Sequence, residues 1–418
     1  MCGRSRADMS AETRGINAPL WALAALGFAG GLGGGVVFPI LPIVGQALGI
    51  APAMIGLILS LNRITRLGVN PLTGHLVDRF GARWPLVAGL FVEGCATLCF
   101  TTGITSVHAS GWFLLGRALW GVGSSLLMVG SLTAALIISA AAERGRATAL
   151  VRMALSFGVP SGLLLGGLTA DLVSARAAFI AASCITFGGM AAAYFIAPAS
   201  PRARPPRQNS ARAPGRSAAL RDLLRPGPLW IVWLFNFVVF FSAQGVILAS
   251  LVLIVRDRDL LLPALNAEGS SGSLMAVMLG TSAIVSWITG RSIDRRGTKS
   301  TVLLPAAIFL ACGFALLAVA HTLLSAALGL GVIGIGLGGI SVPLIVIMGE
   351  LISPERYGRA IGIYQVAGDI GGSLGPITGL EAIARFGPGK SLGVLAALLT
   401  CTMPLAIVLI RIERRLHR

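Results

Sequence analysis

The feature that most constrains this chain is a series of apolar runs, each about 20 residues long, that recur along nearly its whole length. A helix of that length can cross the hydrocarbon core of a bilayer, which is about 30 Å thick. Lipid offers no water to bind free backbone N–H and C=O groups, so such runs are expected to be helical. Because 55% of the 418 residues are hydrophobic and only 12% are charged, we predict an all-α membrane protein.

Twelve such runs follow one another along the chain. We predict membrane spans at 18–45, 53–73, 85–104, 110–138, 147–169, 175–197, 228–255, 272–290, 301–321, 323–350, 359–381 and 391–411. A polar start before a long first span leads us to expect no cleavable signal peptide. The predicted domains are a cytoplasmic N-terminal tail at 1–16, an N-terminal six-helix bundle at 17–197, a basic cytoplasmic linker at 198–227, a C-terminal six-helix bundle at 228–411 and a cytoplasmic C-terminal tail at 412–418.

The net charge of +17 suggests nucleic-acid binding at first sight. The positions of the charges argue against it, because 25 of the 33 basic residues fall on one side of the predicted membrane and five on the other. Basic residues gather in cytoplasmic loops. We therefore predict that both termini are cytoplasmic and that nucleic acid is not a partner. The partners we expect are a lipid bilayer, a small-molecule substrate and protons. The Arg-rich composition favours a bacterial inner (cell) membrane and we expect a monomer.

The two halves of the chain repeat each other. After span two the sequence reads GHLVDRFGAR from Gly74 to Arg83, and after span eight it reads GRSIDRRGTK from Gly290 to Lys299. Glycine rows repeat as well, as Gly158, Gly162 and Gly166 in span five and as Gly371, Gly375 and Gly379 in span eleven. Parallel repeats of this kind place a site at their interface, where the halves rock against each other.

The first loop resembles the signature G-x-x-x-D-R-x-G-[RK]-[RK] of the major facilitator superfamily, with Ala82 at a usually basic position. Span four resembles the family's R-x-x-Q-G-x-G motif from Arg117 to Gly123, with Trp120 in place of Gln. The glycine rows resemble the family's antiporter motif, whose Pro is Leu163 in span five and Pro376 in span eleven. The resemblance implies two six-helix bundles related by a pseudo-two-fold axis and a transporter that works by alternating access.

The resemblance also implies a conformational latch in the two repeated loops. The carboxylate of Asp78 would bind the positive N-terminal end of span eleven and hold the halves together on the cytoplasmic side. Asp294 would be its weaker counterpart against span five. A solvated loop of charges that only orients the chain is the alternative. The predicted latch residues are Gly74, Asp78, Arg79, Gly81, Arg83, Gly290, Asp294 and Arg295.

Charges inside the predicted spans need partners, because a charge at the bilayer centre costs about 2.5–3.5 kcal/mol. Arg66 and Glu93 lie at equal depth in neighbouring spans, so we predict an ion pair that fixes helix rotation. Arg63 and Asp369 would pair across spans two and eleven, with Asp369 the leading proton-coupling residue. The resemblance of span four implies that Arg117 faces the central cavity, for coupling or for an anionic substrate.

Two polar residues in span seven, Asn236 and Gln244, lie among phenylalanines and predict a partly apolar substrate cavity, or else hydrogen bonds between helices. The glycine rows, with Pro376, predict a seam where span five packs on span eight and span eleven on span two. Cys95 and Cys99 have no His or further Cys beside them, so we expect neither a metal site nor a cofactor.

The sequence thus predicts a proton-coupled exporter of small apolar or amphiphilic molecules, with the proton gradient as its energy source. An uptake symporter or facilitator for a small organic anion is the alternative within the same class. A non-transporting membrane sensor or scaffold is the alternative from another class. We do not expect an enzyme, because no His or carboxylate cluster falls at a plausible site.

Overall fold

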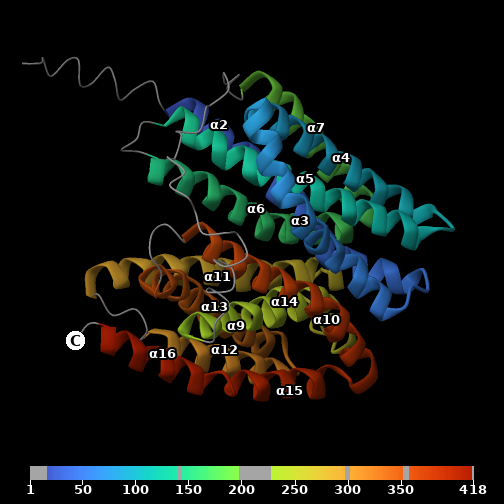
Figure 1. The fold of residues 1–418 in the computed structure, drawn as a ribbon. Helices are drawn as coiled ribbons and strands as arrows, with labels where there is room; N and C mark the ends of the chain where they lie inside the picture. Colours follow the sequence, from blue (N-terminus) through green and yellow to red (C-terminus); the bar gives the residue numbers. More distant parts are fainter. Residues whose placement is uncertain (1–16, 140–143, 197–226, 297–301, 352–356, 417–418) are drawn as a thin grey trace, which may run out of the picture. The chain divides into compact units, whose positions relative to one another are not determined.

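The computed structural model describes residues 17–139, 144–196, 227–296, 302–351 and 357–416, which Figure 1 draws as a coloured ribbon. The elements are α2 (Asn17–Ala47), α3 (Pro52–Phe80), α4 (Arg83–Thr105), α5 (Ala109–Ile138), α6 (Arg144–Leu172), α7 (Ala175–Ile196), α9 (Pro228–Val239), the π-helix η1 (Phe240–Ile247), α10 (Leu248–Asp257), α11 (Ala267–Arg296), α12 (Leu303–Ala318), α13 (Leu323–Leu351), α14 (Tyr357–Phe386), α15 (Pro388–Thr400) and α16 (Met403–Leu416). The run α9–η1–α10 makes one crossing, and so does α15–α16, which gives the twelve crossings predicted.

In the part of the chain that is described, nine helical segments are long and apolar enough to span a membrane, judged by length and composition alone. Of the other three crossings, α12 is a shorter apolar helix, and α3 and α14 carry charges. Arg63 and Arg66 lie within α3, and Asp369 lies within α14. Both crossings therefore carry charges within the membrane, which mark candidate functional positions.

Contacts group the helices into two compact units. Unit 1 comprises Met1–Val37, Thr65–Leu163 and Arg176–Gln208, and unit 2 comprises Phe38–Ile64, Leu164–Ala175 and Asn209–Arg418. Successive helices are antiparallel, so we call the membrane side opposite the start of α2 the far face. The division separates the far-face ends of α2, α3 and α6 from the rest of those helices, which differs from a division at the linker alone. The predicted linker at 198–227 lies outside the described residues, except for its last residue.

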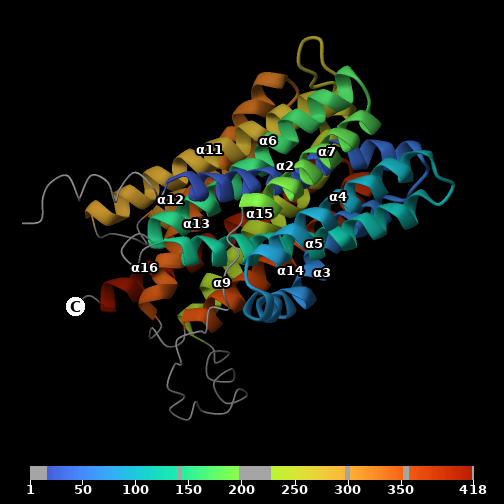
Figure 2. The ribbon, with the colours of Figure 1, turned by 90° about the horizontal axis from the view of Figure 1, so that it is seen from above.

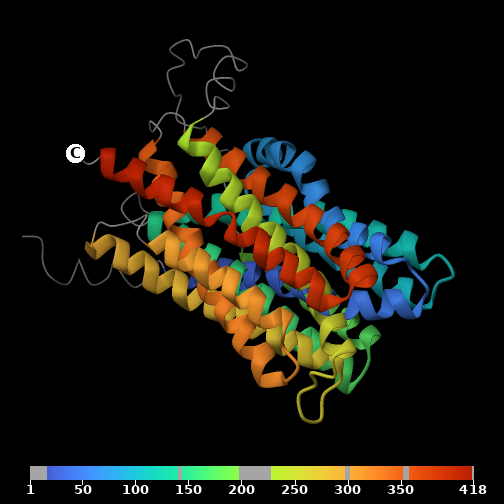
Figure 3. The same ribbon diagram turned by 90° about the horizontal axis from the view of Figure 1, so that it is seen from below.

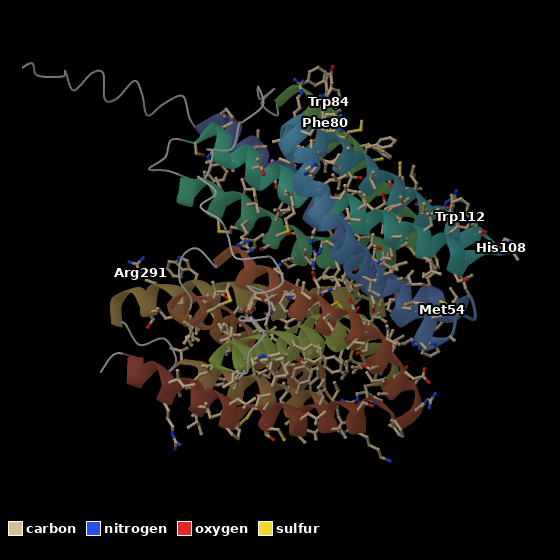
Figure 4. All side chains as sticks on the ribbon, viewed as in Figure 1. Met54, Phe80, Trp84, His108, Trp112 and Arg291 are labelled. Carbon is tan, nitrogen blue, oxygen red and sulfur yellow. The ribbon has the colours of Figure 1, made fainter. Side chains whose placement is uncertain are left out.

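In unit 1, leucine and alanine side chains of five helices form one apolar core. Figures 1 and 2 both show α4 and α5 side by side, as a helical hairpin. Trp84 begins one arm of this hairpin and Trp112 the other, and Figure 4 shows them at its opposite ends. Both indoles are exposed, which suits the two interfaces of a bilayer.

In unit 2, α12 and α13 lie side by side (Figure 3). Arg258, just after α10, closes the end of α12 that faces it. One guanidinium nitrogen donates to the carbonyl oxygens of Leu317 and Ala320, both at 2.8 Å, and the other donates to Ala318 at 2.8 Å. The last carbonyls of a helix have no partner within it. Burial lowers the pKa of the Arg258 guanidinium, which nonetheless stays charged.

Candidate functional site

A polar site in unit 2 is built around Arg63 of α3, whose side chain is half-buried. Its guanidinium nitrogen Nη2 donates a hydrogen bond of 3.1 Å to Oε1 of Gln244. The guanidinium carbon lies 5.4 Å from the centre of the Phe240 ring, within the range of a cation–π contact. On its other side is Gly372 of α14, where an added Cβ would collide with the guanidinium. Arg63 is therefore held between η1 and α14, and Gly372 makes the space for it.

Asp369 is one helical turn before Gly372 on α14 and is 3% exposed. The structure thus brings the predicted partner helices together and places Arg63 within a turn of Asp369. The ion pair between the two stays a prediction. We call Arg63, Phe240, Gln244, Asp369 and Gly372 the Arg63 cluster.

The π-helix η1 gives span seven its shape at this site. It runs over Phe240–Ile247 and carries Gln244. At Gly245 an added Cβ would meet the backbone of Gly375 on α14, so the two helices touch backbone to backbone. The ring of Phe237, which precedes η1, stacks on the ring of Phe241 within it, with the ring centres 5.9 Å apart and an interplanar angle of 15°. Wider turns of this kind occur often at functional sites, and no sequence signal pointed to this one.

Hydrogen bonds fasten α14 to its two neighbours around the cluster. Asn236 is buried and its Nδ2 donates to the Tyr364 carbonyl oxygen at 2.6 Å. Of the two readings of this residue, the structure therefore displays the hydrogen bond between helices. Ser60 Oγ donates to the Ser373 carbonyl oxygen at 2.5 Å, a contact that sequence reasoning missed. A lone serine in an apolar span gave no signal for it.

In unit 1 the predicted Arg66–Glu93 ion pair is wrong: between these described residues none is formed. Glu93 is 1% exposed, and its Oε2 has no hydrogen-bond partner among the residues described. A Cβ added at Gly30 of α2 or at Gly123 of α5 would press against the Glu93 side chain. Equal depth in two helices does not set the direction in which a side chain points, and Glu93 points between α2 and α5.

Arg117 of α5 is 1% exposed. Solvent does not reach this cation in the structure, so its predicted place in an open cavity stays a prediction. Trp120, one turn further along α5, is also buried, and its indole packs on Gly33 and Gly34 of α2. A side chain larger than glycine at Gly33 would collide with this ring. The replacement of the motif's Gln by Trp120 is thus matched by glycines on the facing helix.

Several glycines of the two rows face another helix than predicted. An added Cβ at Gly158 or Gly162 would collide with carbonyl oxygens of Phe28 or Leu32, so these two glycines pack on α2, which is span one, and not on span eight. The partner of Gly166 stays a prediction. On α14, Gly371 and Gly375 face backbone atoms of Phe237 and Phe241, and Gly379 faces Val246. That row packs on span seven, not on span two.

The reason for the correction lies in a second glycine row. Gly27, Gly31 and Gly35 of α2 are also four residues apart, and they meet α6 at Leu155, Gly158 and Gly162. Rows of small residues on two helices allow their backbones to approach closely. The contacts between repeats use other positions: Gly167 faces Glu268 of α11, and Gly56 faces Pro376 and Ile377 of α14. Pro376 therefore does lie where α3 meets α14.

In the first repeated loop, Gly81 has φ +75°, a left-handed conformation that favours glycine. Arg83 donates a hydrogen bond to the Tyr194 carbonyl oxygen, and its guanidinium lies 4.8 Å from the centre of that ring. These contacts tie the start of α4 to the end of α7. Arg79 lies over the Phe80 ring at 5.3 Å, and Gly290 has only an ordinary contact with Val342. The side chains of Asp78, Asp294 and Arg295, and the Gly74 position, lie outside the described residues, so the cytoplasmic latch stays a prediction.

Comparison with known families decides the class of the protein. The sequence profile of the Major Facilitator Superfamily matches residues 23–376. The chain belongs to this superfamily. It is therefore a multi-pass membrane transporter and not an enzyme, and the twelve-helix fold predicted from the sequence is confirmed by its solved relatives.

The sequence relatives include efflux proteins. The chain is 29% identical over 152 residues to Multidrug resistance protein 1 of Bacillus subtilis (strain 168), which is 36% of this chain and 38% of that protein. It is 28% identical over 186 residues to the Multidrug efflux protein YfmO of the same organism, covering 44% and 45% of the two chains. It is also 30% identical over 154 residues to the Probable vesicular acetylcholine transporter-A of Danio rerio, covering 36% and 29%. The matches span less than half the length of these relatives.

The solved structures show the fold alone. A bacterial homologue of the human lysosomal transporter Spinster, in an inward-facing and unoccupied conformation, has a TM-score of 0.76 at 14% identity and covers 96% of this chain and 98% of its own. The xylose transporter XylE from E. coli, in an inward-open conformation, has a TM-score of 0.71 at 13% identity and covers 94% and 95%.

Proposed function

We propose that the protein is a proton-coupled exporter of small apolar or amphiphilic molecules, working by alternating access with the proton gradient as its energy source. The Arg63 cluster is the observation that carries this proposal. It sets a cation, an amide and a buried carboxyl beside three phenylalanine rings, Phe237, Phe240 and Phe241. Such a mixture suits a ligand that is mostly apolar and has one polar group.

The coupling follows from the position of Asp369. A buried carboxylate is favoured while a cation lies close, and it takes up a proton when that cation moves away. Arg63 is on α3 and Asp369 is on α14, so a relative movement of these helices changes the distance between the two charges. The names of the efflux relatives support export over uptake. A bacterial cell membrane with both chain ends in the cytoplasm and a monomeric state belong to the same proposal.

Reconstituted liposomes test it directly. The purified protein is sealed with a pH-sensitive dye inside, and amphiphilic cations that stabilise the protein against heating are added as candidate substrates. We expect substrate-dependent proton movement in the wild type and its loss in Asp369→Asn at unchanged thermal stability. Glu381→Gln is the matched control, because Glu381 lies on the same helix in an exposed pair with Arg385. Proton movement that survives in Asp369→Asn contradicts the coupling role, and uptake in whole cells stopped by a protonophore contradicts export.

A further inference from the structure

Glu93 lies near the middle of α4. It is ten residues after Arg83, where the helix begins, and twelve residues before Thr105, where it ends. At the usual rise per residue these separations are about 15 Å and about 18 Å, so the carboxyl group is close to the centre of the bilayer. Among the described helices, Glu93 and Asp369 are the only acidic residues in the middle third of a helix. The proposed function uses Asp369 and leaves Glu93 without a role.

Apolar groups and helix backbone surround this carboxyl group in unit 1. A Cβ added at Gly30 of α2 would lie 2.9 Å from Oε2 of Glu93 and would also collide with the Leu127 side chain of α5. The carboxyl group and this buried leucine therefore share one narrow space over Gly30. One residue further along α4, Gly94 faces the ring of Phe187 on α7. Glu93 is 1% exposed, so solvent does not reach it.

The hydroxyl groups within a turn of this site on α4 and α5 donate to other acceptors. Thr97 Oγ1, one turn after Glu93, donates to backbone carbonyl oxygens of its own helix. On α5, Ser124 Oγ donates to a carbonyl oxygen of that helix, and Ser125 Oγ donates to Oδ1 of Asn70 at 2.6 Å. A hydroxyl group has one proton to donate. These side chains therefore cannot also donate to a carboxylate at Glu93.

The helices packed on Glu93 bring one cation near it. α2 contains no charged residue, α7 has Arg176 at its far-face end, and the charged residue of α5 is Arg117. Its neighbour Gly116 faces the carbonyl oxygen of Ala96 on α4, so Arg117 lies about one turn from Glu93 toward the far face. Oε2 of Glu93 has no hydrogen-bond partner among the described residues. The guanidinium group of Arg117 therefore does not bind this oxygen.

A carboxylate that leaves water needs hydrogen-bond donors or a bound cation, whereas a protonated carboxylic acid is neutral and fits apolar surroundings. We propose that Glu93 is a second proton-binding site of the transport cycle, which holds its proton while α2, α4 and α5 pack as they do here. The carboxylate forms when these helices separate and water enters as the proton acceptor. The proposal rests on the proposed proton coupling, and it adds a second proton to the one bound by Asp369.

The two sites divide the coupling between the two sequence halves. Glu93 belongs to unit 1 and Asp369 to unit 2. Each carboxyl group binds one proton from water on one side of the membrane and releases it to water on the other, with no other bond formed or broken. One cycle therefore moves two protons for each substrate molecule when both sites are intact.

Infrared spectroscopy tests for the proton directly, because a protonated carboxylic acid has a carbonyl stretch that a carboxylate lacks. The purified protein is kept in a detergent without carbonyl groups at about pH 7, well above the range in which exposed Asp and Glu side chains bind protons. We expect the difference between the wild type and Glu93→Gln to contain one carboxylic-acid band. Glu381→Gln is the matched control, because Glu381 forms an exposed pair with Arg385, and its difference spectrum should lack this band.

Liposomes then count the protons that the cycle moves. Movement of tetraphenylphosphonium, an apolar cation, is measured together with proton movement in the opposite direction. Glu93→Gln retains Asp369, so we expect it to remain coupled but to move about half as many protons per tetraphenylphosphonium as the wild type, because it binds one proton fewer. Glu381→Gln should keep the wild-type ratio.

Identical spectra of the wild type and Glu93→Gln in the carboxylic-acid region mean that Glu93 is ionised, and they overturn the proton site. An unchanged proton ratio in Glu93→Gln overturns its part in the cycle. If Glu93→Gln does not fold, Glu93→Asp replaces it: a carboxylic-acid band that changes frequency supports the site, and an unchanged band overturns it. A wild type that moves no protons with tetraphenylphosphonium overturns the proposed function, and the infrared spectra then decide separately whether Glu93 binds a proton.

Discussion

Glu93 occupies a narrow space between Gly30 of α2 and Gly123 of α5, and its Oε2 has no hydrogen-bond partner among the described residues. The Glu93→Gln variant distinguishes this arrangement from an ion pair with Arg66. Breaking a buried ion pair costs about 3–5 kcal/mol, whereas a glutamine fits the same space without leaving a charge unpaired. We expect Glu93→Gln to unfold at the temperature of the wild type or above it, measured by thermal denaturation in detergent. A loss of about 3–6 °C, which corresponds to about 3–5 kcal/mol in a chain of 418 residues, would return the residue to an ion pair.

At this scale the sequence predicts which side chains need an explanation, but it does not predict their partners. Glu93 and Arg63 stand out because charges are rare inside apolar spans. Depth along a helix follows from residue counting at a known rise. The direction of a side chain around the helix depends on how the neighbouring helices rotate, and that rotation is set by packing. The sequence therefore paired Glu93 with the wrong helix, while Arg63 lies within a turn of its predicted partner.

Helices in this protein pack through rows of glycine, and Gly162 has the closest contact of the row on α6. An added methyl group there collides with the Leu32 carbonyl oxygen, which belongs to a helix backbone and cannot move alone. We expect Gly162→Ala to lower thermal stability by an amount equivalent to about 1–3 kcal/mol. Gly188→Ala is the control, because nothing lies within 4 Å of its added Cβ. Equal melting temperatures for the two variants would contradict the close packing of α6 on α2.

Arg258 stabilises an element that it does not belong to. Its planar guanidinium reaches the carbonyl oxygens of the last two residues of α12 and one carbonyl oxygen beyond the helix, and a lysine cannot match that geometry. Each hydrogen bond from a charged group contributes about 1.5–3 kcal/mol, and Arg258→Lys retains only part of them. We expect a melting temperature several degrees below the wild type, measured in detergent. Arg385→Lys, which alters an exposed pair with Glu381, should change it little. The reverse order of the two variants would rule out the capping role.

The contacts between helices show what a sequence motif can predict and what it cannot. The spacing of four in Gly158 and Gly162 correctly indicates a flat helix face. It does not state which helix is opposite, and Gly27, Gly31 and Gly35 of α2, at the same spacing, were the signal that went unused. The π-helix over Phe240–Ile247 gave no sequence signal, and its Gly245 touches the backbone of α14.

For the whole molecule, the number and limits of the crossings could be read from the sequence almost completely. Lipid forbids unpaired backbone groups, so length and hydropathy leave few alternatives. Helix ends differ from the predicted spans by a few residues, mostly because α3 and α11 continue past the apolar core. The division of the helices into units 1 and 2 could not be predicted from length and hydropathy. The far-face ends of α2, α3 and α6 belong to unit 2 because single hydrogen bonds such as that of Ser60 hold them there.

Orientation in the membrane is the property of the whole molecule that charge alone determines. Because 25 of the 33 basic residues lie on one side of the crossings, we expect the far face to be outside the cell. Single cysteines at Val107, Thr322 and Arg291 in a cysteine-free background test this with a thiol reagent that does not cross membranes. All three residues are exposed, and Figure 4 shows Arg291 projecting from the near-face end of α11. The first two should react in intact cells, and the third only after the membrane is opened. Labelling of Arg291→Cys in intact cells would invert the topology, and the start of α11 at Ala267 would then lie in the cytoplasm.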